Sequence, residues 1–244
     1  MIKRKDKKIQ IITSIISIVI LLGLILCGVN TEVLNQFSNI IGLNIVFEEK
    51  QEEATATPIE FVADDNLKVY FIDVGQADSI LVINQDKSML IDAGNNEDGE
   101  DIVNFIQEKG IEKLNYVIGT HPHEDHIGGL DDIINRIEVE NIYMPKIETT
   151  TKTFEDVLDA ISNKNLKITI PTKGQTFNIG EAQCEIMTDS ILEKENLNLS
   201  SIVIRLEFGN NSFLFMGDAE TKNEESRNWP KTDVLKVGHH RFYH

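Results

Sequence analysis

From residue 67 to residue 244, short apolar runs rich in β-forming residues alternate with segments of helical periodicity. Ser79–Asn84 is typical of a strand bounded by turn residues. Ile102, Phe105 and Ile106 recur at the spacing of a helix face. Strands interleaved with helices favour a layered arrangement in which helices cover a sheet. We therefore predict an α/β (α+β) domain over residues 67–244.

The same patterns place the other elements of this domain. Further strands are predicted at Leu67–Val74, Ser88–Asp92, Tyr116–Gly119, Ile142–Met144, Lys167–Ile170, Cys184–Met187, Ile202–Phe208, Phe213–Met216 and Asp233–Val237. Further helices are predicted around Leu130–Ile137 and Phe154–Ile161. The second half of the domain is therefore expected to be mostly sheet.

The N-terminal part of the chain has a different composition. Residues 1–8 are strongly basic, and the 21 residues Ile9–Val29 carry no charge, which is long enough for a helix to cross a bilayer. The basic flank predicts an uncleaved anchor at the cell membrane, with the N-terminus inside and the domain outside. The alternative is a signal peptide and a secreted protein. Residues 30–66 read as a connector because they include a charge run and a small polar stretch.

The charge of the chain limits the partners it can bind. The formal net charge is -17, and without residues 1–8 the remainder holds 18 basic and 39 acidic residues, which gives -21. Such a surface repels a phosphate backbone unless metals or a local basic patch compensate. Tight binding of duplex DNA is therefore not expected.

The six histidines of the chain fall in two clusters, and the first indicates a metal site. His121 and His123 would lie on the same side of an extended loop and reach one ion, whereas Asp125 and His126 would point to a second ion. Imidazole and carboxylate together suit zinc, manganese or iron. The alternative is a polar surface loop rich in histidine, which four ligand-type residues at this spacing disfavour.

Two later residues complete this hypothesis. A dinuclear site needs a carboxylate that bridges the two ions. Asp218 is suitable because it follows an apolar strand and Gly217, although a turn or helix-capping aspartate is the simpler interpretation of Asp218 alone. His239 follows a predicted strand and Gly238 in the same manner.

Six motifs in order give the chain a specific resemblance. They are Phe71–Ile80, Leu90–Gly94, the loop His121–Gly129, Ser201–Leu206, Phe213–Glu220 and Leu235–His240. With these motifs the chain resembles the metallo-β-lactamase superfamily and, more closely, the soluble metallo-β-lactamase domain of the ComEC competence protein family. The resemblance covers residues 67–240, which is most of the chain beyond the apolar segment.

The resemblance implies a four-layer αββα sandwich with two divalent metal ions, zinc or alternatively manganese, at one edge of the sheets. It implies a first ion on His121, His123 and Asp218, and a second ion on Asp125, His126, Asp218 and His239. A hydroxide between the ions would be the nucleophile, and Asp125 would orient it as a catalytic residue. The implied substrate-contacting or supporting residues are Asp73, Gln76, Asp78, Asp92, Asn198, Ser201 and His240.

The sequence departs from the family pattern at three places. Ala77 stands where the family usually has glycine, and no histidine occurs between His126 and Asp218, where Asn198 or Ser201 occupies the region. The chain also ends at His244, where relatives continue, so the C-terminal part of the domain is expected to be missing.

These features predict a membrane-anchored, extracytoplasmic metal-dependent hydrolase that cleaves a phosphodiester or another ester. A small-molecule or nucleic-acid phosphodiester is the expected substrate. One alternative is hydrolysis of a small ester, a lactone or a cell-wall phosphoester, because the fold serves many substrates. The other is a truncated remnant that binds metal without catalysis.

Overall fold

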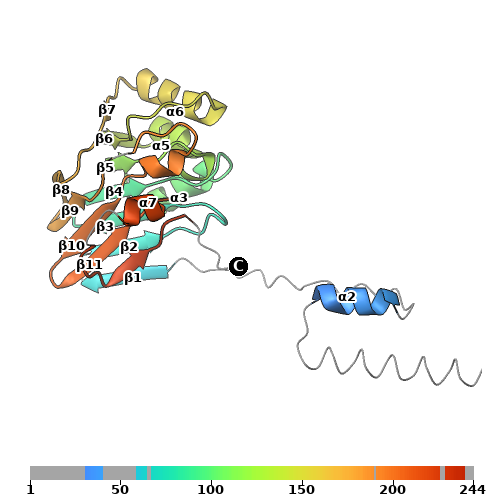
Figure 1. Ribbon diagram of the computed structural model, residues 1–244. Helices are drawn as coiled ribbons and strands as arrows, with labels where there is room; N and C mark the ends of the chain where they lie inside the picture. The colour runs from blue at the N-terminus through green and yellow to red at the C-terminus, as the bar shows by residue number, and fades with distance from the viewer. Residues whose placement is uncertain (1–30, 41–58, 65–66, 190, 226–228, 240–244) are drawn as a thin grey trace, which may run out of the picture. The chain divides into compact units, whose positions relative to one another are not determined.

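The computed structural model describes residues 31–40, 59–64, 67–189, 191–225 and 229–239 (Figure 1). The chain divides into two compact units, Met1–Thr55 and Ala56–His244. The first unit contributes one described helix, α2 (Thr31–Ile40). The predicted anchor, the basic flank and His240 lie outside the described residues. Among the residues described, no helix has the length and apolar character needed to cross a membrane.

The first sheet of the second unit follows the chain order. Among the described residues its strands are β1 (Ile59–Asp64), β2 (Leu67–Phe71), β3 (Ile80–Asn84), β4 (Lys87–Ile91), β5 (Lys113–Ile118), β6 (Glu138–Tyr143) and β7 (Ile168–Thr169). Strands β1 to β4 pair antiparallel, whereas β4 to β7 pair parallel. The connections after β4 contain α3 (Gly99–Glu108), α4 (Glu124–Ile127), α5 (Leu130–Arg136) and α6 (Lys152–Asn163).

The second sheet has the order β12-β11-β10-β9-β8. Its strands are β8 (Thr176–Ile179), β9 (Ala182–Ile186), β10 (Ile204–Phe208), β11 (Asn211–Phe215) and β12 (Val234–Lys236). Two short helices, η1 (Leu197–Ser200) and α7 (Thr221–Glu224), lie between these strands in sequence. Strands β8 to β11 pair antiparallel, and β12 joins β11 parallel at the edge.

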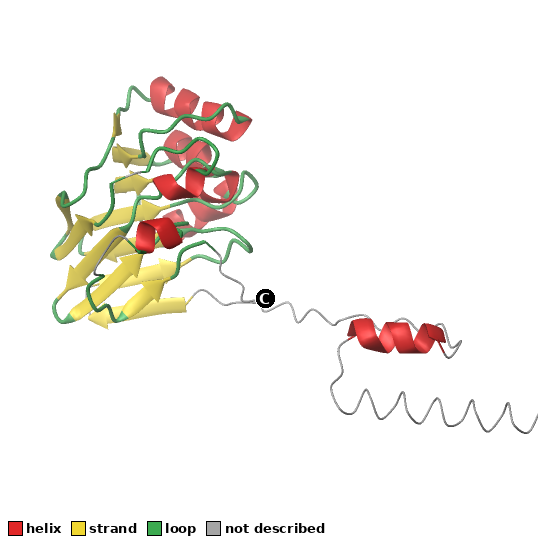
Figure 2. Ribbon diagram, in the orientation of Figure 1, coloured by secondary structure: helices red, strands yellow, loops and turns green. Residues whose placement is uncertain are grey.

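Two apolar clusters hold these layers together. Met89 of the first sheet and Phe213 and Phe215 of the second are buried between the sheets. Ile102 of α3 and Ile133 of α5 are buried against the other face of the first sheet, where α3, α5 and α6 gather (Figure 2). The result is a mixed α/β sandwich, as the sequence predicted. Among the described residues, η1 and α7 are the helices that follow β9, so a fourth, helical layer stays a prediction.

Most predicted elements are confirmed with bounds shifted by a few residues, but residues 30–66 are not only a connector. They contain α2 and also β1, which pairs with β2 from Ile59↔Phe71 onward. The second unit therefore begins before Leu67. The charge run and the small polar residues indicate a change in composition. An edge strand such as β1, however, is held by backbone hydrogen bonds, which composition does not reveal. Strand β8 was also not predicted.

Both sheets end their parallel strands at one edge. Asp92 follows β4 and Thr120 follows β5, while Asp218 follows β11 and His239 follows β12. In open α/β sheets the carboxyl ends of parallel strands are where functional side chains collect. Here the topology brings the histidine loop and Asp218 together from two different sheets.

Candidate metal centre

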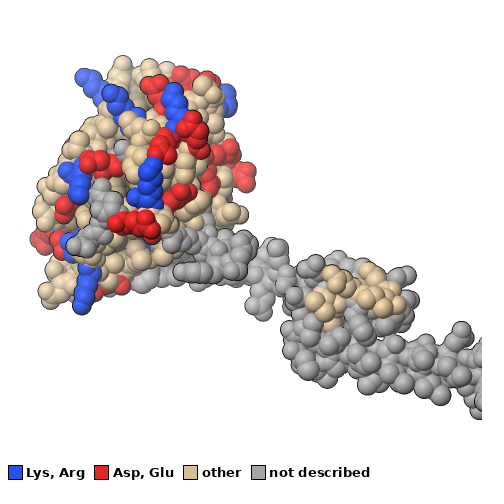
Figure 3. All heavy atoms as spheres, in the orientation of Figure 1, with Lys and Arg blue, Asp and Glu red and all other residues tan. Residues whose placement is uncertain are grey.

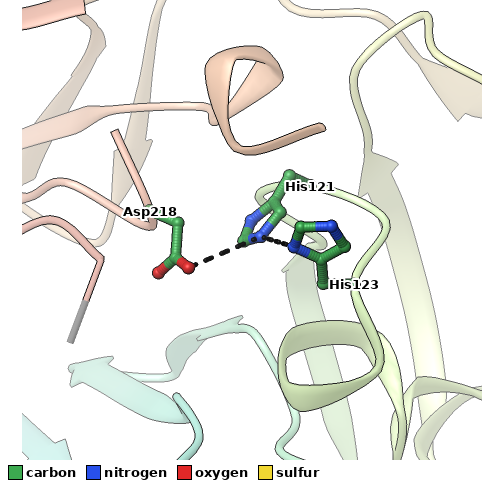
Figure 4. A group of neighbouring side chains, drawn as sticks. All are labelled: His121, His123 and Asp218. Carbon is green, nitrogen blue, oxygen red and sulfur yellow. Dashed lines mark hydrogen bonds and ion pairs between the residues drawn. The ribbon is translucent and has the colours of Figure 1, made fainter. Parts of the chain in front are cut away.

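Two imidazoles and one carboxylate converge in front of the histidine loop (Figure 4). His121 Nε2 lies 3.0 Å from His123 Nδ1 and 3.8 Å from Asp218 Oδ2. One ligand atom from each residue lies within 4.8 Å of the others. His121 and Asp218 are buried, whereas His123 is half-buried. Two ring nitrogens and a carboxylate oxygen that face one another suit a zinc-type ion.

A second group of possible ligands shares Asp218 with the first. It consists of Asp78, His126 and Asp218, again with one ligand atom each inside 4.8 Å. His126 Nε2 lies 3.1 Å from Asp218 Oδ1. Asp78 Oδ2 lies 3.8 Å from the other ring nitrogen, Nδ1, which also contacts Asp92. The two oxygens of Asp218 therefore face different groups, as the carboxylate that bridges two ions must.

Asp92 holds the histidine loop from behind. Its carboxylate accepts hydrogen bonds from Thr120 N at 2.8 Å, from Thr120 Oγ1 at 2.7 Å and from His126 Nδ1 at 2.8 Å. Asp92 is buried and has a φ of 57°, a left-handed conformation that non-glycine residues adopt mainly at special sites. A carboxylate behind a histidine fixes the tautomer and leaves the other nitrogen for the metal. The predicted supporting role of Asp92 agrees with this arrangement.

Backbone contacts place Asp218 beside this loop. Gly217 has a φ of 52°, and a Cβ there would lie 3.0 Å from Thr120. The glycine is thus required both by its conformation and by the close approach of the two loops. Ser201 Oγ accepts a hydrogen bond from Asp218 N at 3.1 Å. Ser201 therefore supports Asp218 through the backbone, which is a role in keeping with its predicted place near the site.

The charges of this cluster are strongly coupled. Burial lowers the pKa of His121 well below its ordinary value, and the charge of His126 adds to this effect. Burial also disfavours the charged form of His126, but Asp92 and Asp218 outweigh it and raise the pKa of His126 to about 10. Burial alone would raise the pKa of Asp218, yet His126 and His121 hold it well below its usual range. These shifts favour the neutral form of His121 and the charged form of His126.

Two predicted ligands lie beside these groups rather than within them. Asp125 Oδ2 is 3.9 Å from His126 Nε2, and its side chain is one third exposed. His239 Nδ1 lies 3.2 Å from Glu220, and a ring nitrogen of His239 lies 3.2 Å from Asn198 Nδ2. Asp78 stands in the second group with His126 and Asp218, and the sequence predicts Asp125 and His239 as further ligands there. Asn198, which the resemblance places near the site, also donates to Glu220 at 3.1 Å.

Two other predicted residues are exposed, and two residues of the site were missed. Asp73 accepts from Gly75 N at 3.3 Å within its own turn, and Gln76 is exposed. Glu220 and Lys236 were given no role, although both lie inside the quoted motifs. Lys236 forms an ion pair with Asp78. The sequence signal was a lysine inside an apolar strand, because a buried lysine usually has a charged partner.

A comparison with known proteins identifies the family of the chain. The profile of the metallo-beta-lactamase superfamily matches residues 72–243. The chain belongs to the metallo-β-lactamase superfamily. All residues of both ligand groups lie inside the matched range.

Two curated relatives are ComEC-type competence proteins. ComE operon protein 3 of Bacillus subtilis is 30% identical over 195 residues, which are 71% of this chain and 25% of that protein. Recombination protein 2 of Haemophilus influenzae is 31% identical over 176 residues, which are 69% of this chain and 21% of that protein. The chain thus spans about a quarter of the length of these relatives.

One solved structure that matches part of this chain is the metallo-beta-lactamase fold protein YhfI from Bacillus subtilis. It has 16% sequence identity and a TM-score of 0.48, with 70% of each chain covered.

Proposed function

We propose that this metallo-β-lactamase superfamily chain is a metal-dependent hydrolase that cleaves phosphodiesters at a dinuclear zinc centre. The observation that carries the proposal is the position of Asp218, whose two carboxylate oxygens face two separate groups of ligand-type residues. An aspartate that only caps a turn or a helix would not need ligand-type residues beside both of its oxygens. We also propose that the domain has the four-layer αββα form of the fold.

Different residues of the centre would bind each of the two ions. His121 and His123 supply nitrogens to one ion. Burial lowers the pKa of His121 and so favours the neutral form, which is the form that binds metal. Asp78 and His126 supply the second ion, with Asp92 orienting His126. When bound, two such ions lower the pKa of a water molecule and polarise the scissile ester.

Asp125 is the proposed catalytic residue that orients the attacking water. Its side chain is one third exposed and lies 3.9 Å from His126 Nε2, so it faces the second group from the open side. His239 is the proposed further ligand on this side. It would have to turn from Glu220 toward the centre, and its half-exposed ring leaves room for that movement.

The test is to purify the full chain in mild detergent and measure metal content and turnover together. We expect about two zinc ions per chain and zinc-dependent hydrolysis of bis-p-nitrophenyl phosphate. His123→Ala should lose at least one ion and most turnover, with the fold retained, because the half-buried His123 ring makes no capping hydrogen bond to α4. A folded parent without metal would overturn the proposal, and turnover of p-nitrophenyl acetate alone would favour the small-ester alternative.

We also propose that residues 9–29 anchor the chain in the cell membrane with the domain outside. The support is the uncharged 21-residue segment and its basic flank. On the face drawn in Figure 3, basic and acidic side chains are intermixed, which agrees with a domain that does not coat duplex DNA. A protease added to intact cells should digest the domain. Full protection of the domain, in cells shown to contain it, would contradict this orientation.

A further inference from the structure

Lys236 occupies an unusual position for a lysine. On β12, Val234 packs into the core between the sheets, and Lys236 is two residues further along the same strand. Alternate residues of a strand share a face, so Lys236 also points to the inner side of the second sheet. Only 13% of its side chain is exposed. Lysine is rarely this buried unless its ammonium has a partner, so the contacts of Lys236 must explain why it is buried.

Both polar contacts of the Lys236 ammonium lie at the metal centre. Its ammonium forms an ion pair with Asp78, whose side chain is 11% exposed, and it donates a hydrogen bond to the carbonyl oxygen of Gly217 at 2.9 Å. Gly217 immediately precedes Asp218. Lys236 therefore reaches from the edge strand of the second sheet to both the shared carboxylate loop and the second ligand group.

The pairing of Lys236 with Asp78 competes with metal binding by the second group. Asp78 belongs to that group with His126 and Asp218. A divalent ion on the Asp78 carboxylate would repel an ammonium held at the same carboxylate, because like charges a few ångströms apart interact strongly in a poorly solvated site. Metal binding would thus release the Lys236 ammonium from Asp78 while the strand keeps it beside the centre.

A released ammonium at this place needs a new anionic partner. Leaving it unpaired in a largely buried site is costly. The substrate class of the proposed function supplies such a partner, since the phosphodiester group carries one negative charge. We propose that Lys236 is the anion-binding residue of this centre and holds a non-bridging phosphoryl oxygen, after serving as the counter-ion of Asp78 in the metal-free chain. This inference rests on the proposed function.

The test separates anion binding from turnover. Lys236→Met keeps the length of the apolar stem and removes the charge, whereas Lys236→Arg keeps the charge. The full zinc-loaded chain is titrated calorimetrically with inorganic phosphate, and KM and kcat are measured with bis-p-nitrophenyl phosphate. We expect Lys236→Met to weaken phosphate binding about tenfold or more, as loss of a charged hydrogen bond does. The same variant should raise KM more than it lowers kcat, and Lys236→Arg should restore most of both.

Lys113→Met is the matched control, because Lys113 pairs with Glu140 at the opposite end of β5 and its loss changes the net charge equally. This control should bind phosphate like the parent. Unchanged phosphate affinity in Lys236→Met would overturn the inference, as would a loss of affinity that only follows loss of zinc. Lys236-dependent phosphate binding without phosphodiester turnover would support the inference and overturn the proposed function. Phosphodiester turnover and phosphate binding that do not depend on Lys236 would support the proposed function and overturn the inference.

Discussion

Asp218→Asn should remove metal from both ligand groups at once. The two Asp218 oxygens lie 3.8 Å from His121 Nε2 and 3.1 Å from His126 Nε2, so one substitution reaches both groups. Asparagine has the same shape but a single neutral carbonyl oxygen. Changes of residues behind metal ligands already cost 10–100-fold in affinity or activity. We therefore expect zinc affinity and phosphodiester turnover to fall by at least about a hundredfold.

The matched control is Asp156→Asn on the surface of α6. Asp156 pairs with Lys152 one turn away, and its side chain is 40% exposed. It should keep the zinc content and turnover of the parent, as measured by elemental analysis and by release of p-nitrophenol. If Asp218→Asn kept both ions, Asp218 would be only the turn residue that its sequence context also allows.

The fold could be read from the sequence wherever local pattern and burial agree. Met89 and Phe213 lie in apolar runs, and such runs became core strands. Ile102 and Ile106 mark a helix that the structure places against the first sheet. Strand β1 was missed because its order comes from pairing with β2, which is a long-range backbone interaction. Local composition carries no record of such a partner.

The site could be predicted as far as the histidine loop extends. His121, His123 and His126 lie in one short segment, so their spacing alone indicated a metal. Asp78 could not be ranked as a possible ligand in the same way, because it enters the second group only when the first sheet meets the second. The same holds for Lys236, whose partner is 158 residues away in sequence (236 minus 78). Contacts across the two sheets depend on topology rather than on spacing.

His239 shows a different limit of sequence reasoning. Its place after a strand and Gly238 predicts a ligand of the centre, whereas its ring pairs with Glu220 at 3.2 Å. Histidine accepts several kinds of partner, and a nearby carboxylate competes with a metal for the same nitrogen. The choice depends on the presence of the ion.

Asp92→Asn should destabilise the metal-free protein strongly. Asparagine tolerates the left-handed conformation of residue 92, so the effect comes from the lost charge rather than from the backbone. The charge lies 2.8 Å from His126 in a fully buried pair. Removing one partner of such a pair costs roughly 3–5 kcal/mol, and we expect the lower end of this range because Asp218 stays 3.1 Å from His126. Urea unfolding with a chelator present should report this loss at pH 6. Asp86→Asn, on an exposed turn with Lys87, is the control that should change little.

The pH dependence of this loss follows from the direction of the His126 shift. The pKa of His126 is raised to about 10 in the folded chain, against about 6.5 when unfolded. Between these values the folded state holds one proton more, so its stability falls by about 1.4 kcal/mol per pH unit as pH rises. The contribution is complete below about pH 6.5 and is lost as pH passes through about 10. Asp92→Asn removes the largest of the interactions that raise this pKa, so its stability should vary less over the same range. The two unfolding curves should therefore approach each other at high pH, and a constant separation from pH 6 to pH 10 would contradict a charged His126 held by Asp92.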